Sequence, residues 1–156
     1  MTGRVGIGFD VHPFADDDKP LVLGGITFDG RGLAGHSDGD VIVHAVIDAL
    51  LGAAGLGDIG EHFPDTDERW RGADGRVLLG AAREMLDGRG WSVVNVDCSV
   101  VLDAPKLAPR RTEMQEQLSR DVGAPVTVKG KRSEGLGALG RGEGIAAWAV
   151  ALLDRQ

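Results

Sequence analysis

Three residues in the first third of the chain have side chains that commonly bind metals: Asp10, His12 and His44. Asp10 and His12 lie at the end of the segment of residues 4–12, in which apolar residues alternate with small or polar ones. This pattern is typical of a β-strand. Alternate residues of a strand share a face, which puts Asp10 and His12 about 6.5 Å apart on one side. Two imidazoles and one carboxylate suit a divalent metal such as zinc, with a fourth position for water or substrate. The sequence therefore predicts a catalytic metal site.

The same residues also allow a purely structural interpretation. Pro13 can end the strand, and the Asp10 carboxylate can bond to nearby main chain in a turn. His44 can be a hydrogen-bonded histidine of the core. The metal site therefore depends on whether residues 10–12 and residue 44 meet in the fold.

His44 lies one turn into residues 41–51, a segment that is apolar on nearly all sides and is expected to form a buried helix. His44 and Asp48 interrupt it at i and i+4, and so share one face. Asp48 can orient the imidazole or provide a second carboxylate near the metal. Two polar residues on a buried helix are costly without partners, which favours a site. Three residues before the helix can cap its N-terminus: Ser37, Asp38 or Asp40.

Periodicity and turn residues predict the remaining elements. Residues 21–28 are expected to form a short hairpin or a bulged strand around Gly24-Gly25, and strands are expected over residues 92–102 and 126–129. Helices are expected over residues 74–87 and from Ala104-Pro105-Lys106, with Pro105 near the first turn, to about residue 122. Residues 52–73 are expected to form a long loop, and residues 145–153 suit either a helix or a buried strand. In the strand over residues 92–102, one face is expected to carry Val94, Val96, Cys98, Val100 and Leu102.

Composition excludes several classes of protein. A chain of 156 residues is expected to form one domain, residues 1–156, with a genuine core. A net charge of −7 argues against a nucleic-acid partner. The single cysteine, Cys98, cannot form an intramolecular disulfide, and its apolar surroundings predict a buried thiol. No stretch has the length and apolarity of a membrane span, and no leader-like segment is present, so we expect a cytoplasmic protein without a membrane partner.

Six motifs occur in order along the chain: Phe9-Asp10-Val11-His12, Ala34-Gly35-His36-Ser37-Asp38-Gly39-Asp40, Gly57-Asp58-Ile59-Gly60, Phe63-Pro64-Asp65-Thr66-Asp67, Ala104-Pro105-Lys106 and Gly140-Arg141-Gly142-Glu143-Gly144. With these motifs the chain resembles, over about residues 4–154, the 2-C-methyl-D-erythritol 2,4-cyclodiphosphate synthase family of the non-mevalonate isoprenoid pathway. The resemblance implies an α+β fold, a mixed β-sheet with helices packed on one face. It also implies a homotrimer with active sites between subunits, and it favours a strand for residues 145–153.

The family's reaction converts 4-diphosphocytidyl-2-C-methyl-D-erythritol 2-phosphate into a cyclic diphosphate with release of CMP. The substrate's own 2-phosphate attacks the β-phosphorus, so the protein must position the substrate and stabilise charge rather than supply a nucleophile. Asp10, His12 and His44 match the family's zinc ligands. Glu134 matches the acidic ligand of a magnesium ion that bridges the α- and β-phosphates. An acidic protein that binds a polyanion needs such cations.

Other positions match the family's substrate contacts. His36 and Ser37 would donate hydrogen bonds to phosphate, with His36 aiding the transition state, although the same segment also suits a plain capping turn. Residues 58–60 match contacts to hydroxyls, residues 63–67 a loop over the methylerythritol, and residues 102–108 the cytosine pocket. Arg141 matches a position near the trimer axis. The complete set of expected substrate contacts is Asp10, Val11, His12, His36, Ser37, Asp58, Ile59, Gly60, Phe63, Pro64, Asp65, Thr66, Asp67, Ala104, Pro105, Lys106, Leu107, Ala108, Lys131, Arg132, Ser133, Glu134 and Arg141.

One segment departs from the family pattern. Where the family commonly has a run of threonines before the acidic residue, this chain has Lys131-Arg132-Ser133. Arg132 aligns with a threonine that assists the transition state, and Ser133 keeps a hydroxyl beside it. Either basic side chain could supply charge to the same phosphate. With His36, Arg132 and Ser133 are the expected catalytic residues.

Two other functions fit parts of the pattern. A zinc-dependent phosphohydrolase would use the same aspartate and histidines to activate water against an external phosphate ester. A non-catalytic trimeric nucleotide-binding module would bind the nucleotide without turnover. The products formed, or their absence, discriminate between these functions and the cyclase.

Overall fold

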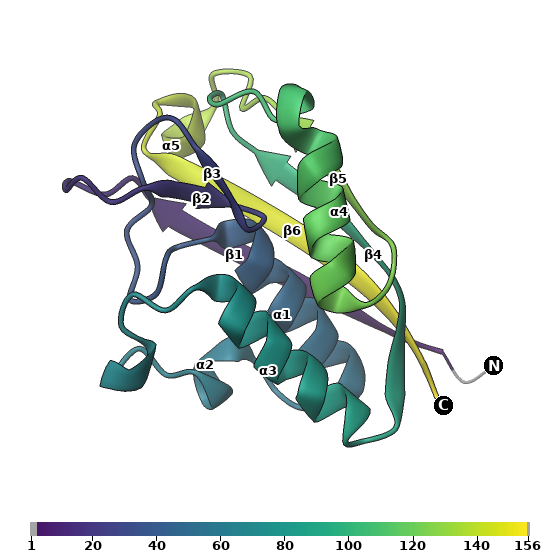
Figure 1. Ribbon diagram of the computed structural model, residues 1–156. Helices are drawn as coiled ribbons and strands as arrows, with labels where there is room; N and C mark the ends of the chain where they lie inside the picture. Colours follow the sequence, from purple (N-terminus) through teal and green to yellow (C-terminus); the bar gives the residue numbers. More distant parts are fainter. Residues whose placement is uncertain (1–2, 156) are drawn as a thin grey trace.

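A four-stranded mixed sheet forms the centre of the fold, with the strand order β1-β6-β4-β5 (Figure 1). The computed structural model describes residues 3–155. The strand β6 (Gly144–Arg155) pairs antiparallel with β1 (Arg4–Pro13) on one side and with β4 (Trp91–Val101) on the other. The fourth strand, β5 (Val126–Lys131), runs parallel to β4. Residues 145–153, which suited either a helix or a strand, thus belong to a strand, and the sheet is mixed as expected.

Three helices cover one face of this sheet: α1 (Val41–Ala54), α3 (Gly75–Asp87) and α4 (Arg111–Val122) (Figure 1). Helix α1 lies over β1 and β6, α3 packs against α1, and α4 packs against α3 and lies over β5. The core between helices and sheet consists of fully buried side chains from each layer, among them Ile47, Leu79, Leu118 and Ile145. The expected α+β class with helices on one face is confirmed.

Two glycines of β1 allow α1 to lie directly on that strand. A Cβ atom at Gly8 would lie 1.8 Å from the main-chain oxygen of Ala45, and one at Gly6 would lie 2.0 Å from that of Ala49. Any side chain there would push the helix away. Since alternate residues of β1 share a face, the strand points Asp10 and His12 toward this same helix.

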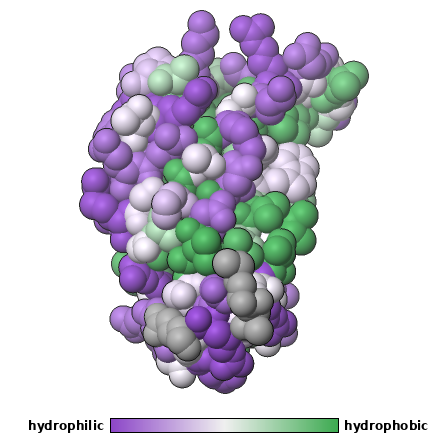
Figure 2. All heavy atoms as spheres, turned by 90° about the vertical axis from the view of Figure 1, so that its right-hand side faces the viewer, coloured by the Kyte–Doolittle hydropathy of each residue, from purple (hydrophilic) through white to green (hydrophobic). Residues whose placement is uncertain are grey.

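The opposite face of β1 and β6 carries apolar side chains that no described element covers. Their exposed fractions range from 38% to 70% for Val5, Ile7, Phe9, Val11, Trp148 and Val150. The rings of Phe9 and Trp148 lie against each other, with centroids 5.0 Å apart. Figure 2 shows hydrophobic residues exposed together on the surface. An exposed apolar area of this kind marks a contact surface.

Smaller elements connect the layers. Strands β2 (Leu21–Leu23) and β3 (Ile26–Phe28) form the expected hairpin, and α3 occupies the expected helix. The long loop expected over residues 52–73 is wrong in part, because α1 continues to Ala54 and two short helices, α2 (Ile59–His62) and η1 (Glu68–Trp70), follow. Asp58 and Asp67 cap these short helices with their side chains. The short α5 (Gly137–Gly140) precedes β6, and no helix among residues 3–155 is long and apolar enough to cross a bilayer.

The expected helix start at Ala104-Pro105-Lys106 is wrong. The Ala104–Pro105 peptide bond is cis, and the chain becomes helical only at η2 (Ala108–Arg110), which leads into α4. Pro109, not Pro105, is the proline of the first turn. Residues 103–107 are therefore free to form the wall of a cleft.

The prediction that one face of the strand over residues 92–102 carries all five apolar residues is also wrong at one position, Val94. A break in register between Val93 and Asn95 leaves Val94 40% exposed, whereas Val96, Cys98 and Val100 are buried. A β-bulge of this kind changes which residues point inward on either side of it.

Candidate metal and substrate site

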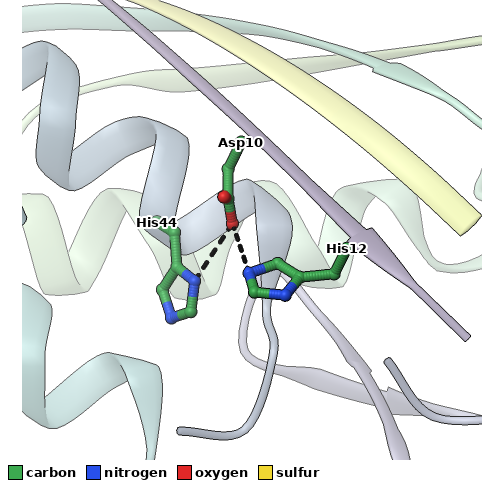
Figure 3. Close-up of side chains that lie close together, drawn as sticks. All are labelled: Asp10, His12 and His44. Atoms are coloured by element: carbon green, nitrogen blue, oxygen red, sulfur yellow. Dashed lines mark hydrogen bonds and ion pairs between the residues drawn. The ribbon is translucent and has the colours of Figure 1, made fainter. Parts of the chain in front are cut away.

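Asp10, His12 and His44 meet where the end of β1 lies beside the first turn of α1 (Figure 3). Asp10 Oδ2 lies 3.0 Å from His12 Nε2 and 3.1 Å from His44 Nδ1. One ligand atom from each residue lies within 4.8 Å of the others, close enough for a shared cation. Residues 10–12 and residue 44 therefore meet in the fold, which is the condition that a metal site requires.

The outer nitrogens of both imidazoles have their own partners. His12 Nδ1 lies 2.5 Å from the carbonyl oxygen of Ala34, which can only accept, so this nitrogen donates its proton. His44 Nε2 lies 3.1 Å from Ser37 Oγ. When Nε2 donates to Ser37, a neutral His44 presents the lone pair of Nδ1 to the Asp10 side. When both rings are neutral in this way, two imidazole lone pairs and a carboxylate face one point, a set of donors that fits a divalent cation; a proton on either inner nitrogen bonds to Asp10 instead.

The charges at this point are set by burial and by the two histidines. Burial alone raises the pKa of the Asp10 carboxyl, but hydrogen bonds and charges from His12 and His44 outweigh it and bring the pKa down to about 2. The Asp10 hydrogen bond in turn raises the pKa of His12 above its ordinary value. The carboxylate is therefore ionised at neutral pH, as a metal ligand must be.

Asp48 does not pair with His44, although the two share a helix face. Its carboxylate accepts a hydrogen bond from the main-chain N–H of Ile59 at 2.8 Å, which ties α1 to α2. Burial raises the pKa of Asp48. Ser37, rather than Asp48, is the partner that orients His44.

A cleft of about 440 Å³ opens from the three clustered residues. The predicted site residues that line it are Asp10, His12, His36, Ser37, His44, Ile59, Gly60, Phe63, Pro64 and Asp65. Three further residues line the cleft to which sequence reasoning gave no role there: Gly35, Trp70 and Leu78. Asp58, Thr66 and Asp67 do not line it; the Asp58 side chain accepts from Glu61 N–H and the Asp67 side chain from Arg69 N–H.

His36 and Ser37 belong to a loop that two other segments hold. The main-chain N–H of Gly72 donates to the carbonyl of His36 at 2.7 Å, and His36 Nε2 lies 2.9 Å from the carbonyl of Asp67. Of the three candidate caps of α1, Asp40 is the one that accepts from the first helical N–H groups, at Ile42 and Val43. Ser37 is therefore free to face the cleft.

A second, basic cleft of about 580 Å³ lies between the 102–108 segment and the end of β5. Its predicted residues are Leu102, Asp103, Pro105, Lys106, Leu107, Ala108, Lys131 and Arg132, and the structure adds Arg111 and Gly130. Arg111 was missed because its helix was expected to begin earlier. The two clefts share no lining residue, so within one chain the metal ligands and the basic cleft are separate.

Several predicted contacts lie outside both clefts. Ser133 is buried, and the Asp103 carboxylate accepts from its N–H at 3.0 Å and from its hydroxyl at 2.6 Å. Glu134 is exposed, adopts a left-handed φ of 55°, and is not part of the Asp10 cluster. Arg141 pairs with Glu143 at 2.6 Å. Val11 lies on the exposed apolar face, and Ala104 lines another cavity, beside the β2–β3 hairpin.

The chain thus has a possible divalent-cation site beside one cleft and a separate basic cleft, an arrangement typical of enzymes that act on small molecules. The model of the YgbB family matches residues 3–154, and the chain belongs to this family.

Curated relatives match along their whole length. The 2-C-methyl-D-erythritol 2,4-cyclodiphosphate synthase of Bordetella avium is 55% identical over 157 residues, covering 98% of this chain and 96% of the relative. The synthase of the same name from Rubrobacter xylanophilus is 56% identical, covering 97% and 95%.

Solved structures agree with this assignment. The bifunctional IspDF of Campylobacter jejuni matches with a TM-score of 0.94 and 39% identity, covering 99% of this chain and 42% of that chain. A CDP complex of IspF from Plasmodium falciparum matches with a TM-score of 0.85 and 32% identity, covering 99% and 97%.

Proposed function

We propose that this chain is a 2-C-methyl-D-erythritol 2,4-cyclodiphosphate synthase of isoprenoid biosynthesis. It converts 4-diphosphocytidyl-2-C-methyl-D-erythritol 2-phosphate into the cyclic 2,4-diphosphate and CMP. The observation that carries this proposal is the convergence of Asp10, His12 and His44 on one cation position, in a chain that matches synthases at 55–56% identity over nearly their full length.

The residues around the cation position would act on the phosphate that is attacked. A divalent cation, which we take to be zinc, would be held by Asp10, His12 and His44 and would polarise that phosphate as a Lewis acid. Ser37 accepts from His44 Nε2, so its own hydroxyl proton is free to donate to a phosphate oxygen. His36 is held beside it at the edge of the same cleft by its Nε2, which donates to the carbonyl of Asp67, and Nδ1 of the imidazolium form would supply a second donor.

The basic cleft would hold the cytidine diphosphate part of the substrate. Lys106, Arg111, Lys131 and Arg132 line it and would offset the negative charge of the diphosphate. Solved relatives with bound CDP support a nucleotide in this family's site. The Ser133 hydroxyl donates to Asp103, so Arg132, rather than Ser133, is the better candidate to contact the transferred phosphate. The exposed carboxylate of Glu134 would bind the magnesium ion that accompanies the diphosphate.

A homotrimer would bring the two clefts together. One substrate needs both the cation position and the basic cleft, yet these are separate within one chain. The uncovered apolar face of β1 and β6 offers a contact surface between copies, through which one subunit's metal ligands would meet the next subunit's basic cleft. We place the enzyme in the cytoplasm, where its single cysteine would stay reduced.

The decisive experiment incubates the purified protein with the cytidyl-methylerythritol 2-phosphate substrate and magnesium, with and without a zinc chelator, followed by phosphorus NMR. We expect a cyclic diphosphate and CMP, lost on chelation and restored by zinc. Release of inorganic phosphate instead would identify a phosphohydrolase. Tight CDP binding without any product would identify a nucleotide-binding module.

A further inference from the structure

Lys19 lies in none of the described clefts, yet its side chain reaches the loop that carries His36 and Ser37. The ammonium group donates to the carbonyl oxygen of Gly35 at 3.1 Å and to that of Ser37 at 2.7 Å. The lysine follows β1 in the chain and is 16 and 18 residues away from these acceptors. Its side chain is half-buried, so the bonds are partly shielded from water. Two hydrogen bonds from a charged donor are stronger than two from a neutral donor.

With the two Lys19 bonds, the carbonyl of each residue from Gly35 to Ser37 has a hydrogen-bond partner. The carbonyls of Gly35 and Ser37 point to the lysine, while the carbonyl between them, that of His36, accepts from Gly72 N–H at 2.7 Å. The next N–H, that of Asp38, donates to the carbonyl of Ala73 at 3.1 Å. The loop is thus held from both sides, by Lys19 on one and by residues 72–73 on the other. Without Lys19, the carbonyls of Gly35 and Ser37 lose this partner, while the bonds to residues 72–73 and the side-chain bond from Ser37 to His44 remain.

Lys19 itself is placed by its own segment. Its main-chain N–H donates to the Asp17 carboxylate at 3.1 Å, forming a turn. Its carbonyl oxygen packs against Gly32, where an added Cβ atom would lie 2.2 Å from that oxygen. The N–H of Ala15 donates to the carbonyl of Gly32 at 2.8 Å, which joins the two segments. The lysine therefore extends from a fixed anchor toward the loop.

We propose that Lys19 is a positioning residue of the cyclase reaction: it bridges the carbonyls of Gly35 and Ser37 and so fixes the donors of His36 and Ser37 at the cation position. The effect that we expect on catalysis rests on the proposed function. Ser37 Oγ lies 3.1 Å from His44 Nε2, so a shift of the loop moves the phosphate donor relative to the metal ligand. Misplacement by about 1 Å lowers a rate about 100-fold.

The test compares Lys19→Met with a matched control, Arg31→Met. Arg31 is also a cation that donates to a main-chain carbonyl of the same segment, that of Ala15 at 2.9 Å, but it makes no bond to residues 35–37. Hydrogen–deuterium exchange of the zinc-loaded protein without substrate measures the loop directly. We expect faster exchange of peptides covering residues 35–38 in Lys19→Met and unchanged exchange there in Arg31→Met.

Kinetics then measure the consequence for the reaction. We expect Lys19→Met to lower kcat about 10- to 100-fold, with KM changed less than about threefold and with full zinc content. Lys19→Arg, which keeps a charged donor, should recover part of kcat. If Lys19→Met does not fold, Lys19→Gln, which retains a donor without the charge, takes its place in both measurements.

Three results would overturn the proposal. Unchanged exchange of residues 35–38 would show that Lys19 does not hold the loop. Faster exchange with a normal kcat would show that the loop position is unimportant for the reaction. A raised KM with a normal kcat would show that Lys19 only binds substrate. Failure of the proposed function itself is distinguishable, because the exchange measurement needs no substrate and the wild-type protein would then form no cyclic product.

Discussion

Ser37 and His44 are joined by a hydrogen bond of 3.1 Å between the serine Oγ and the histidine Nε2. This bond connects the loop before α1 to a side chain of the cation position, whose other nitrogen faces Asp10 at 3.1 Å. Ser37 is buried to 8% exposure, so water does not readily replace it as a partner. A residue expected to contact phosphate or to cap α1 therefore fixes the orientation of a candidate metal ligand.

Ser37→Ala is expected to weaken metal binding as well as catalysis. The variant leaves the Nε2 proton of His44 without its acceptor, and loss of such an outer partner typically costs about 10- to 100-fold in metal affinity. Competition with a chromophoric chelator measures the zinc affinity. Ser37→Thr, which keeps the hydroxyl, is the control and should retain most of it. Equal zinc affinity in Ser37→Ala and wild type would contradict this role.

His44→Ala is expected to abolish both zinc binding and cyclase activity while the protein stays folded. Removing one of three ligands leaves too few donors for a stable site. His62→Ala is the matched control, because His62 bonds to the carbonyl of Leu56 at 2.7 Å and lies outside the cleft. Zinc per subunit, measured by mass spectrometry of the metal, should fall to near zero in His44→Ala only. Full zinc content in that variant would refute the ligand assignment.

The candidate metal ligands Asp10, His12 and His44 could be predicted because the pattern around each of them is local in the sequence. A strand period of two places Asp10 and His12 on one face, and an apolar helix with one histidine places His44. What the sequence does not show is that the helix lies on that strand. The absence of side chains at Gly6 and Gly8, where a Cβ would meet α1, makes that packing possible.

Other parts of the site depend on tertiary contacts and could not be predicted. Lys19 reaches its acceptors across more than 15 residues of sequence, and Trp70 enters the cleft through the packing of η1. The wrong helix start at Pro105 has a local cause: a proline suits the first turn of a helix, but it also suits a cis turn, and the true first turn contains Pro109. Periodicity likewise cannot reveal the bulge that exposes Val94.

Asp40→Ala is expected to destabilise the fold strongly. The carboxylate is fully buried and accepts from the N–H groups of Gly24 and Gly25 in the β2–β3 turn, at 2.9 and 2.7 Å, as well as from Ile42 and Val43. Leaving these donors unpaired should lower the free energy of unfolding by about 3 to 5 kcal/mol. Asp74→Ala, which removes the exposed cap of α3, should cost about 1 kcal/mol. Urea denaturation compares the two variants, and equal losses would contradict the joining role of Asp40.

The contribution of Asp40 to stability should depend on pH. Burial and the nearby charge of Asp38 outweigh the N–H donors and raise the pKa of Asp40 from 3.8 to about 6. The folded state therefore holds this proton more tightly than the unfolded state. The stabilisation from this proton is complete below pH 3.8 and is lost as pH rises through about 6. Asp40→Asn cannot titrate and so lacks this stabilisation. Its free energy of unfolding should lie further below that of wild type at pH 4 than at pH 7. The opposite trend in urea denaturation would show that the four N–H groups dominate.

Ile7→Glu is expected to separate the proposed trimer into subunits. Ile7 is 70% exposed in the middle of the apolar face of β1, and a carboxylate there would have to be buried when copies associate. Val77→Glu is the matched control, since Val77 is 60% exposed but lies on α3, on the helix side of the sheet. Light scattering after size exclusion should give about three times the chain mass of 16.3 kDa for wild type and Val77→Glu, and one chain mass for Ile7→Glu. The separated subunits should keep their zinc and lose cyclase activity, because each substrate needs clefts from two copies. A trimeric Ile7→Glu, or an active monomer, would show that this face does not assemble the site.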